Sequence, residues 1–305
     1  MATPFGQPTV SGDTPTAEVP LGAELPAPAG LPARRRFSWS WLRWPPVWVL
    51  AALVLLTLLA PVISSYGPQT PDPAEKLLPP SSRHWFGTDP LGMDVFTRVL
   101  YATRIDLAIA VLSVLLGIAW GLPLGALAAY SGRLIDRVLT RFAEMIQAFP
   151  QVLFAMALFA AFGSSLVNLV LIIGFLNFPV YLMMVRSVAL PLRDADFVQA
   201  ARILGLPRWR IVLRYVVPNV LVPVFSQFAL SCAYAVQLIA GLSFIGLGVR
   251  IPTPEWGAMI NQGASYIVFG EWWPSIFPGI AIVISVFALS GIGRRLRRAL
   301  LREPR

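Results

Sequence analysis

The side chains that usually carry out enzyme chemistry are scarce in this sequence of 305 residues. It has one histidine, His84, one cysteine, Cys232, and one lysine, Lys76. A nucleophilic serine needs a base within hydrogen-bond reach, yet the serines in apolar runs, Ser231 and Ser243, are far in the chain from the single histidine. One histidine and one cysteine do not build a metal site, and no Gly-x-x-x-x-Gly-Lys phosphate loop is present. The sequence therefore predicts a chain with no catalytic residues and no metal or cofactor of its own.

The composition is that of a membrane protein. Hydrophobic residues make up 56% of the chain and charged residues 13%, and the mean hydropathy of +0.69 is too high for a soluble globular domain. The formal net charge is +9, but the basic residues stand in short clusters beside apolar runs, which is typical of topology signals. We predict an all-α, polytopic membrane helical bundle with no nucleic-acid partner.

Six apolar runs are long enough to cross a bilayer as helices, because a span needs about 20 residues at a rise of about 1.5 Å each. The six predicted transmembrane helices cover residues 47–63, 105–129, 145–162, 166–190, 220–241 and 276–293. A Pro-rich stretch at the start of the chain has few large apolar residues, and we predict that it is disordered.

The basic residues are distributed unevenly between the two sides that six spans create. With the N-terminus inside the cell, 19 of the 24 lysines and arginines face the cytosol, in agreement with the positive-inside rule. Both termini are therefore predicted to be cytosolic. The predicted parts are a cytosolic tail at 1–46, a transmembrane domain at 47–293 with an external loop at 64–104 and a cytosolic segment at 191–218, and a basic cytosolic tail at 294–305.

One long polar segment, residues 194–223, lies between apolar runs. Small and apolar residues recur in it at helical spacing and predict one narrow face: Phe197, Ala200, Ala201 and Leu204. Gly205 suits the left-handed conformation that ends a helix, and Pro207 suits the first turn of a following helix. We predict a helix, a bend and a second helix. A cytosolic loop whose arginines only fix topology is the simpler alternative.

The order of residues in this segment resembles the EAA motif of permease subunits of binding-protein-dependent ABC importers. That motif has Glu-Ala-Ala, then Gly, then Ile-x-Leu-Pro, and at the same spacings this chain has Gln-Ala-Ala, Gly, and Tyr-x-Val-Pro. The resemblance implies a type I importer fold and a coupling helix that docks in a groove of an ATPase subunit. It assigns coupling to Gln199, Ala200, Ala201, Gly205, Pro207 and Pro218. A glutamine in place of the usual glutamate replaces a salt bridge to the partner with a neutral hydrogen bond.

Two further blocks resemble the dipeptide, oligopeptide and nickel branch of this family. Residues 87–94 read Gly-Thr-Asp-Pro-Leu-Gly-Met-Asp, with Met93 where relatives usually have Arg. An ordinary turn with Asp94 as a helix cap is the alternative reading. Residues 241–257 contain Gly-Leu-Ser-Phe-Ile-Gly-Leu-Gly and Ile-Pro-Thr-Pro-Glu-Trp-Gly, which implies an external loop where a solute-binding protein docks. Its candidate contacts are Pro252, Pro254, Glu255 and Trp256, and a purely structural loop is the alternative.

Polar side chains share a face on two of the predicted spans. Asn177 and Tyr181 are four residues apart on the fourth, and Gln227, Ser231 and Tyr234 recur at i, i+4 and i+7 on the fifth. In hydrocarbon such side chains usually face protein or a water-filled cavity, so they are candidates for lining a translocation path. Interhelical hydrogen bonding is an equally good explanation of each one.

The resemblance also implies a set of partners and a location. It implies a non-catalytic subunit of the bacterial inner membrane that works with a second homologous permease, two ATPase subunits that bind ATP and Mg²⁺, and an extracytoplasmic solute-binding protein. The basic C-terminal end suits anionic membrane lipid. The implied cargo is a dipeptide or an oligopeptide, while a nickel chelate or another small solute fits the same architecture. A membrane-embedded enzyme or an uncoupled channel is the alternative of another class.

Overall fold

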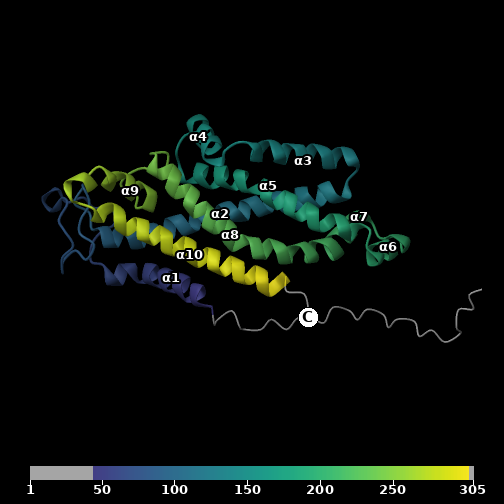
Figure 1. Ribbon diagram of the computed structural model, residues 1–305, viewed down its shortest axis with the longest axis horizontal. Helices are drawn as coiled ribbons and strands as arrows, with labels where there is room; N and C mark the ends of the chain where they lie inside the picture. The colour runs from purple at the N-terminus through teal and green to yellow at the C-terminus, as the bar shows by residue number, and fades with distance from the viewer. Residues whose placement is uncertain (1–43, 302–305) are drawn as a thin grey trace, which may run out of the picture. The chain divides into compact units, whose positions relative to one another are not determined.

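The computed structural model describes residues 44–301, so most of the predicted N-terminal tail and the last four residues lie outside the described range. Within that range the chain is helical, and its only β-type pairing is one isolated bridge between Thr88 and Asp94. The body consists of four long helices that pack against one another (Figure 1): α2 (Val95–Tyr130), α5 (Leu166–Arg193), α8 (Val217–Phe244) and α10 (Trp273–Leu301). The predicted all-α membrane bundle is confirmed.

Five helices among the described residues are long and apolar enough to cross a membrane. They are α1 (Pro45–Ile63), α2, α5, the continuous helical stretch Arg208–Phe244 that contains α8, and α10. The predicted third span, residues 145–162, is wrong as a single helix, since α3 (Arg133–Ala148) and α4 (Gln151–Phe162) meet at 94°. A proline disfavours the helical conformation of the residue before it, and Phe149, before Pro150, is extended. A sixth span exists only if α3 and α4 form one broken crossing.

Two predicted boundaries also shift. The predicted external loop at 64–104 ends as a loop at Asp94, because the Asp94 carboxylate accepts a hydrogen bond from the Thr97 N–H at 2.8 Å and starts α2 there. Asp94 is thus the helix cap that its position predicts. The predicted basic tail is not separate over its first residues, because 294–301 continue α10.

The most extensive interface joins α2 to α5, and it depends on glycines spaced by four residues along α2. A Cβ at Gly117 would lie 2.9 Å from the Asn177 Cβ, and one at Gly121 would lie 2.5 Å from the Tyr181 Cβ. Gly125 repeats the close approach against Val185, at 2.8 Å. Small residues at this spacing let two membrane helices approach closely. The stripe fixes α5 against α2 along about two helical turns.

The smaller helices lie at the two ends of the long ones. The predicted polar segment forms α6 (Asp196–Ile203) and α7 (Arg208–Ile211), and a π-helical turn at Val212–Val216 joins α7 to α8. At the other end, α9 (Trp256–Ala264) packs on α8 and α10 (Figure 1). Short 3₁₀ helices occupy Pro73–Glu75 and Ile267–Phe269.

Candidate functional site

The bend after α6 is a Schellman motif centred on Gly205. This residue has a φ of +76°, in the left-handed region that its sequence position predicts. Its N–H donates to the Arg202 carbonyl at 2.9 Å, and the Leu206 N–H donates to the Ala201 carbonyl at 3.1 Å. These two bonds are the pair that defines the motif. The predicted helix, bend and helix are therefore confirmed.

A small apolar cluster holds this segment in shape. Val198 and Ala201 of α6 are buried against Ile211, and Leu206, Tyr215 and Tyr130 pack around them. Because Tyr130 is the last residue of α2, the cluster ties the α6 bend to a second long helix. The predicted narrow face is only partly correct. Of the four predicted residues only Ala201 is buried. The other buried residue of α6 is Val198, which the predicted face does not include.

The other side of α6 presents large apolar side chains outward. Ile203 and Leu204 are 86% and 79% exposed, and Trp209 on α7 is 60% exposed. Phe197 is 45% exposed, and the small Ala200, one turn later, is exposed as well. An outward-facing apolar patch on a polar segment is a candidate interaction surface.

The remaining predicted coupling residues lie around this patch. Gln199 is exposed, and its Nε2 donates to the carbonyl of Asp194, the residue that ends α5, at 3.1 Å, so its side chain joins α6 to the end of α5. Pro207 stands at the cap position before Arg208, one residue before its predicted place inside the helix. Pro218 follows the π-helical turn, which widens the backbone where a proline would otherwise clash with the preceding turn. The stretch from residue 208 to residue 244 therefore stays continuous.

The structure separates the polar residues of the spans into two groups. Asn177 and Tyr181 are buried against the α2 glycines, and the Asn177 Nδ2 donates to the Ile173 carbonyl of its own helix at 2.9 Å. Ser231 is also buried. These three residues lie between packed helices and not on an open face, while the Asn177 hydrogen bond stays within α5.

The second group lies on an open face of α8. Tyr234 is 41% exposed and Gln227 is half-buried, and Gln237, one turn after Tyr234, is exposed as well. Gly241 continues this face, and a Cβ there would meet nothing within 4 Å. The polar face of α8 in this chain thus consists of Gln227, Tyr234 and Gln237. The sequence prediction did not include Gln237, although it lies three residues after Tyr234 and therefore close to the same helical face.

The loop before α9 is anchored inside the chain. Glu255 is buried and caps α9, accepting hydrogen bonds from the N–H groups of Gly257 and Ala258, both at 2.8 Å. Trp256 is buried too, and its Nε1 donates to the Val99 carbonyl of α2 at 3.1 Å. Pro254 is buried and Pro252 is exposed. Buried side chains offer no surface to a docking protein in this conformation, so direct contact stays a prediction for Pro252 alone.

Asp106 of α2 completes this anchor. Its Oδ2 accepts a hydrogen bond from the Trp256 N–H at 3.1 Å, although the two residues are 150 positions apart. Burial raises the pKa of the nearby Glu255 carboxyl, and the two α9 N–H groups oppose that rise. The hydrogen bond between Asp106 and Trp256 fixes the start of α9 to α2.

A second buried polar cluster lies in the loop that resembles the peptide and nickel branch. Arg98 is fully buried, and its Nε lies 3.4 Å from the Asp89 Oδ2. Its Nη1 donates to the Pro252 carbonyl at 3.1 Å and contacts the Met93 Sδ at 2.9 Å. Burial raises the pKa of the Asp89 carboxyl, and the positive charge of Arg98 opposes this effect. The guanidinium therefore joins the 87–94 block to the loop before α9.

His84 occupies the neighbouring part of the same loop. Its Nδ1 lies 2.9 Å from the Asp94 Oδ1, and its Nε2 lies 3.3 Å from the Glu75 Oε2. The imidazole thus bridges the cap of α2 and the 3₁₀ helix at Pro73–Glu75. The sequence does not mark Arg98 and Asp106, because each contacts a loop about 150 residues further along the chain.

Comparison with known proteins defines the class. Residues 121–302 match the family described as the inner membrane component of binding-protein-dependent transport systems. The match covers more than half of the chain and includes α6, its bend and α8. The chain belongs to this family of transport permease components.

Similar proteins of known name lie within the peptide branch. The chain is 36% identical over 252 residues to the dipeptide transport system permease protein DppC of Alkalihalophilus pseudofirmus, covering 83% of each chain. It is 38% identical over 221 residues to the glutathione transport system permease protein GsiD of Pectobacterium atrosepticum, covering 72% of this chain and 73% of that protein.

Solved structures of the same fold are more distant in sequence. A chain from inward facing conformations of the MetNI methionine ABC transporter aligns with a TM-score of 0.54 at 18% identity, covering 67% of this chain and 97% of that one. A chain of an amino acid ABC transporter with histidines aligns with a TM-score of 0.51 at 15% identity, covering 67% and 94%. These likenesses show the fold, which is that of ABC transporter permeases.

Proposed function

We propose that this chain is one permease subunit of an ATP-driven importer of small peptides. In this proposal a second, homologous permease completes the translocation path, and two ATPase subunits bind ATP and Mg²⁺ and supply the energy. An extracytoplasmic binding protein delivers the solute. The chain itself hydrolyses nothing. The peptide cargo is supported by the names of relatives that the chain matches over most of its length.

The observation that carries the proposal is the outward apolar patch on α6. Ile203 and Leu204 are exposed on a helix whose opposite side is buried against α7 and Tyr130. An ATPase subunit that covers these side chains would remove apolar surface from water, which favours association by about 25 cal/mol per Å². The rigid Schellman end keeps both residues in a fixed orientation. We place this patch and both chain termini on the cytosolic side, in agreement with the basic residues of the same segment.

Movement of α6 would pass to the rest of the bundle through two connections. The first is the stretch Arg208–Phe244, which runs from the patch to the loop before α9 as one helical body. The second is α5, which precedes α6 directly and is fixed to α2 by the glycine stripe. A displacement at the cytosolic end therefore changes the position of the α8 polar face and of the outer loop together.

Within the proposed path, the open polar face of α8 is the part of this chain that would contact the solute. Gln227, Tyr234 and Gln237 offer neutral hydrogen-bonding groups, which suit a peptide backbone. Asn177, Tyr181 and Ser231 are buried and would act by holding the helices in place. The binding protein would supply most of the selectivity among peptides, nickel chelates and other small solutes.

Replacement of the exposed patch tests the assignment. The double substitution Ile203→Asp and Leu204→Asp places two charges on a surface that the chain itself does not use for packing, so folding and membrane insertion should persist. We expect the variant chain to lose the ATPase subunits during affinity purification from membranes. Val268→Asp is the matched control, because Val268 is 82% exposed at the opposite end of the bundle. Equal recovery of the ATPase subunits with the patch variant and the control would refute the coupling assignment.

A further inference from the structure

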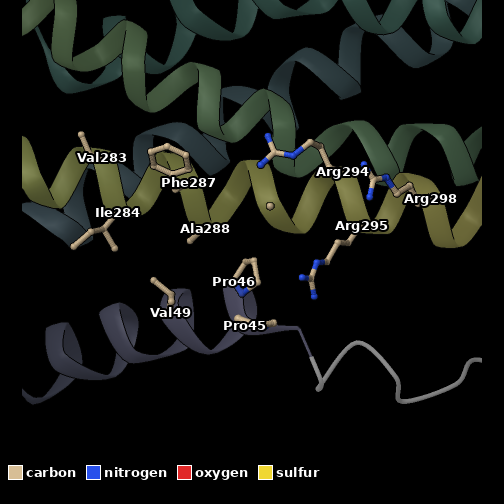
Figure 2. A pocket seen from close by; sticks show the side chains of 11 residues that line it. Pro45, Pro46, Val49, Val283, Ile284, Phe287, Ala288, Arg294, Arg295 and Arg298 are labelled. Atoms are coloured by element: carbon tan, nitrogen blue, oxygen red, sulfur yellow. The ribbon is translucent and has the colours of Figure 1, made fainter.

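A hollow lies between α1 and the end of α10, apart from the regions described above. Its volume is about 500 Å³. Figure 2 shows Pro46 and Val49 of α1 on one side and Ile284 and Ala288 of α10 on the other. Arg294, Arg295 and Arg298 lie together at one end, where the apolar side chains stop.

The α10 side of the hollow is a single helical stripe with two chemical halves. The lining residues recur at spacings of three and four, so they lie on one face: Ile284, Phe287, Ala288, Gly291, Arg294, Arg295 and Arg298. The residues before Gly291 are apolar and the residues after it are arginines. A ligand that fills the hollow must therefore have an apolar body and a negatively charged end, in that order along α10.

The position of the change from apolar to basic agrees with the membrane boundary. The apolar run predicted to span the membrane ends at residue 293, and the first arginine of the stripe follows directly. A lipid molecule has its phosphate at this depth and its acyl chains beside the apolar turns. Arginine binds phosphate oxygens with two parallel hydrogen bonds, which favours it for this contact.

Within residues 44–301, no partner neutralises the charge of these three arginines. Each side chain is exposed, and none forms an ion pair or a side-chain hydrogen bond in the described part of the chain. Three positive charges close together repel one another unless an anion lies between them. The wall opposite them is tight, because a Cβ at Gly291 would lie 2.7 Å from the Pro46 Cγ. The two helices meet at this point of the hollow, which both residues line.

We propose that this hollow binds an anionic phospholipid, with its phosphate held by Arg294, Arg295 and Arg298 and an acyl chain lying in the groove between α1 and α10. The bound lipid fills the space between the two helices and joins α1 to the rest of the bundle. The site selects the charge of the head group through the arginines and accepts the chain through Val49, Ile284 and Ala288. This inference depends on the chain spanning a membrane and not on the peptide cargo.

Native mass spectrometry of the complete complex tests the proposal. The complex, purified in detergent, is incubated with phosphatidylglycerol or with phosphatidylcholine of the same chain length, and bound lipids are counted. We expect retained phosphatidylglycerol and little phosphatidylcholine. The variant Arg295→Gln should weaken phosphatidylglycerol binding about fivefold, since each basic side chain near a lipid surface is worth about 1 kcal/mol.

Arg297→Gln is the matched control, because Arg297 is exposed on the same helix but does not line the hollow. It removes the same charge and should leave binding unchanged. Ile284→Trp, which fills the apolar half, should reduce the binding of both lipids and leave the preference for phosphatidylglycerol intact. Equal binding by the Arg295→Gln and Arg297→Gln variants would overturn the proposal.

Two further arms distinguish other occupants. Inorganic phosphate, added at the same concentration as the lipid, should not displace phosphatidylglycerol, and displacement would assign the arginines to a free anion instead. A photo-reactive amino acid at position 284 in native membranes should capture lipid. Capture of the second permease in its place would show that the hollow is a protein interface and would overturn the lipid assignment.

Discussion

At Gly205 the backbone has a conformation that suits glycine and few other residues. Its φ of +76° puts it in the left-handed region, which costs a residue with a side chain about 1–2 kcal/mol. A Cβ at this position would meet nothing within 4 Å. Any effect of a substitution here therefore comes from the backbone angle of the bend and not from a clash.

We expect Gly205→Val to lower solute-stimulated ATP hydrolysis in the reconstituted complex, because the altered bend reorients the α6 patch. Gly163→Val is a matched control. Gly163 also has a positive φ, +83°, and a Cβ there would likewise meet nothing within 4 Å, but it lies between α4 and α5. Gly163 combines its positive φ with an extended ψ of 162°, a region that side chains rarely adopt, so Gly163→Val also strains the backbone but outside the coupling segment. Only Gly205→Val should therefore lose coupling. Equal stimulation in the two variants would contradict the role of the bend.

The residues that the sequence predicts well are those whose partners lie nearby in the chain. Asp94 caps α2 by accepting a hydrogen bond from the Thr97 N–H, three residues further on. Gly205 ends α6, with its N–H donating to the Arg202 carbonyl three residues back. Asp106 and Arg98 act on a loop about 150 residues further along. No local pattern marks such contacts, so the role of Glu255 and Trp256 as internal anchors appears only in three dimensions.

At the scale of helices, the interface of α2 and α5 depends on close approach at three glycines. Gly121 is the tightest point, because a Cβ there would also lie 2.7 Å from the Phe178 carbonyl oxygen of α5. A bidentate ion pair between Asp136 of α3 and Arg186 of α5 adds a second connection, with the Nη2 to Oδ2 distance at 2.8 Å. These contacts make α2, α3 and α5 one packed unit.

Gly121→Ala should destabilise the purified complex by about 1–3 kcal/mol, the usual cost of an overpacked core. The added methyl must push α5 away from α2. Gly241→Ala is the control, because this glycine also lies inside a membrane helix but faces open space. It should leave stability unchanged or raise it slightly, since alanine favours the helix. Thermal unfolding followed by size-exclusion chromatography measures both, and equal melting temperatures would contradict the glycine-stripe account.

The helices that the sequence predicts correctly are those with one long, uninterrupted apolar run. Five of the six predicted spans correspond to long helices, with ends that extend beyond the hydrophobic core. The remaining one fails because hydropathy averages over Pro150, whereas the backbone bends there by 94°. The bend in the polar segment is predicted correctly because Gly205 and Pro207 constrain the backbone conformation directly. Hydropathy does not measure this property.

For the whole molecule, the fold connects a patch at one end to a buried anchor at the other. The stretch Arg208–Phe244 begins beside α6 and ends at the loop that Arg98 and Asp106 hold to α2. Membership in the family of inner membrane components of binding-protein-dependent transport systems agrees with this arrangement. The proposed coupling through the patch requires that α6 faces the cytosol and that an ATPase subunit covers it.

Site-specific labelling of the intact complex in native membranes measures both properties. The single cysteine, Cys232, is buried in α8 and can be replaced by alanine, after which Leu204→Cys and Val268→Cys each provide one exposed thiol. We predict that the thiol at position 204 is protected from an impermeant reagent added outside and cross-links to an ATPase subunit, while the thiol at position 268 is labelled from outside. Labelling of position 204 from outside, with no cross-link to an ATPase subunit, would contradict the coupling role of α6.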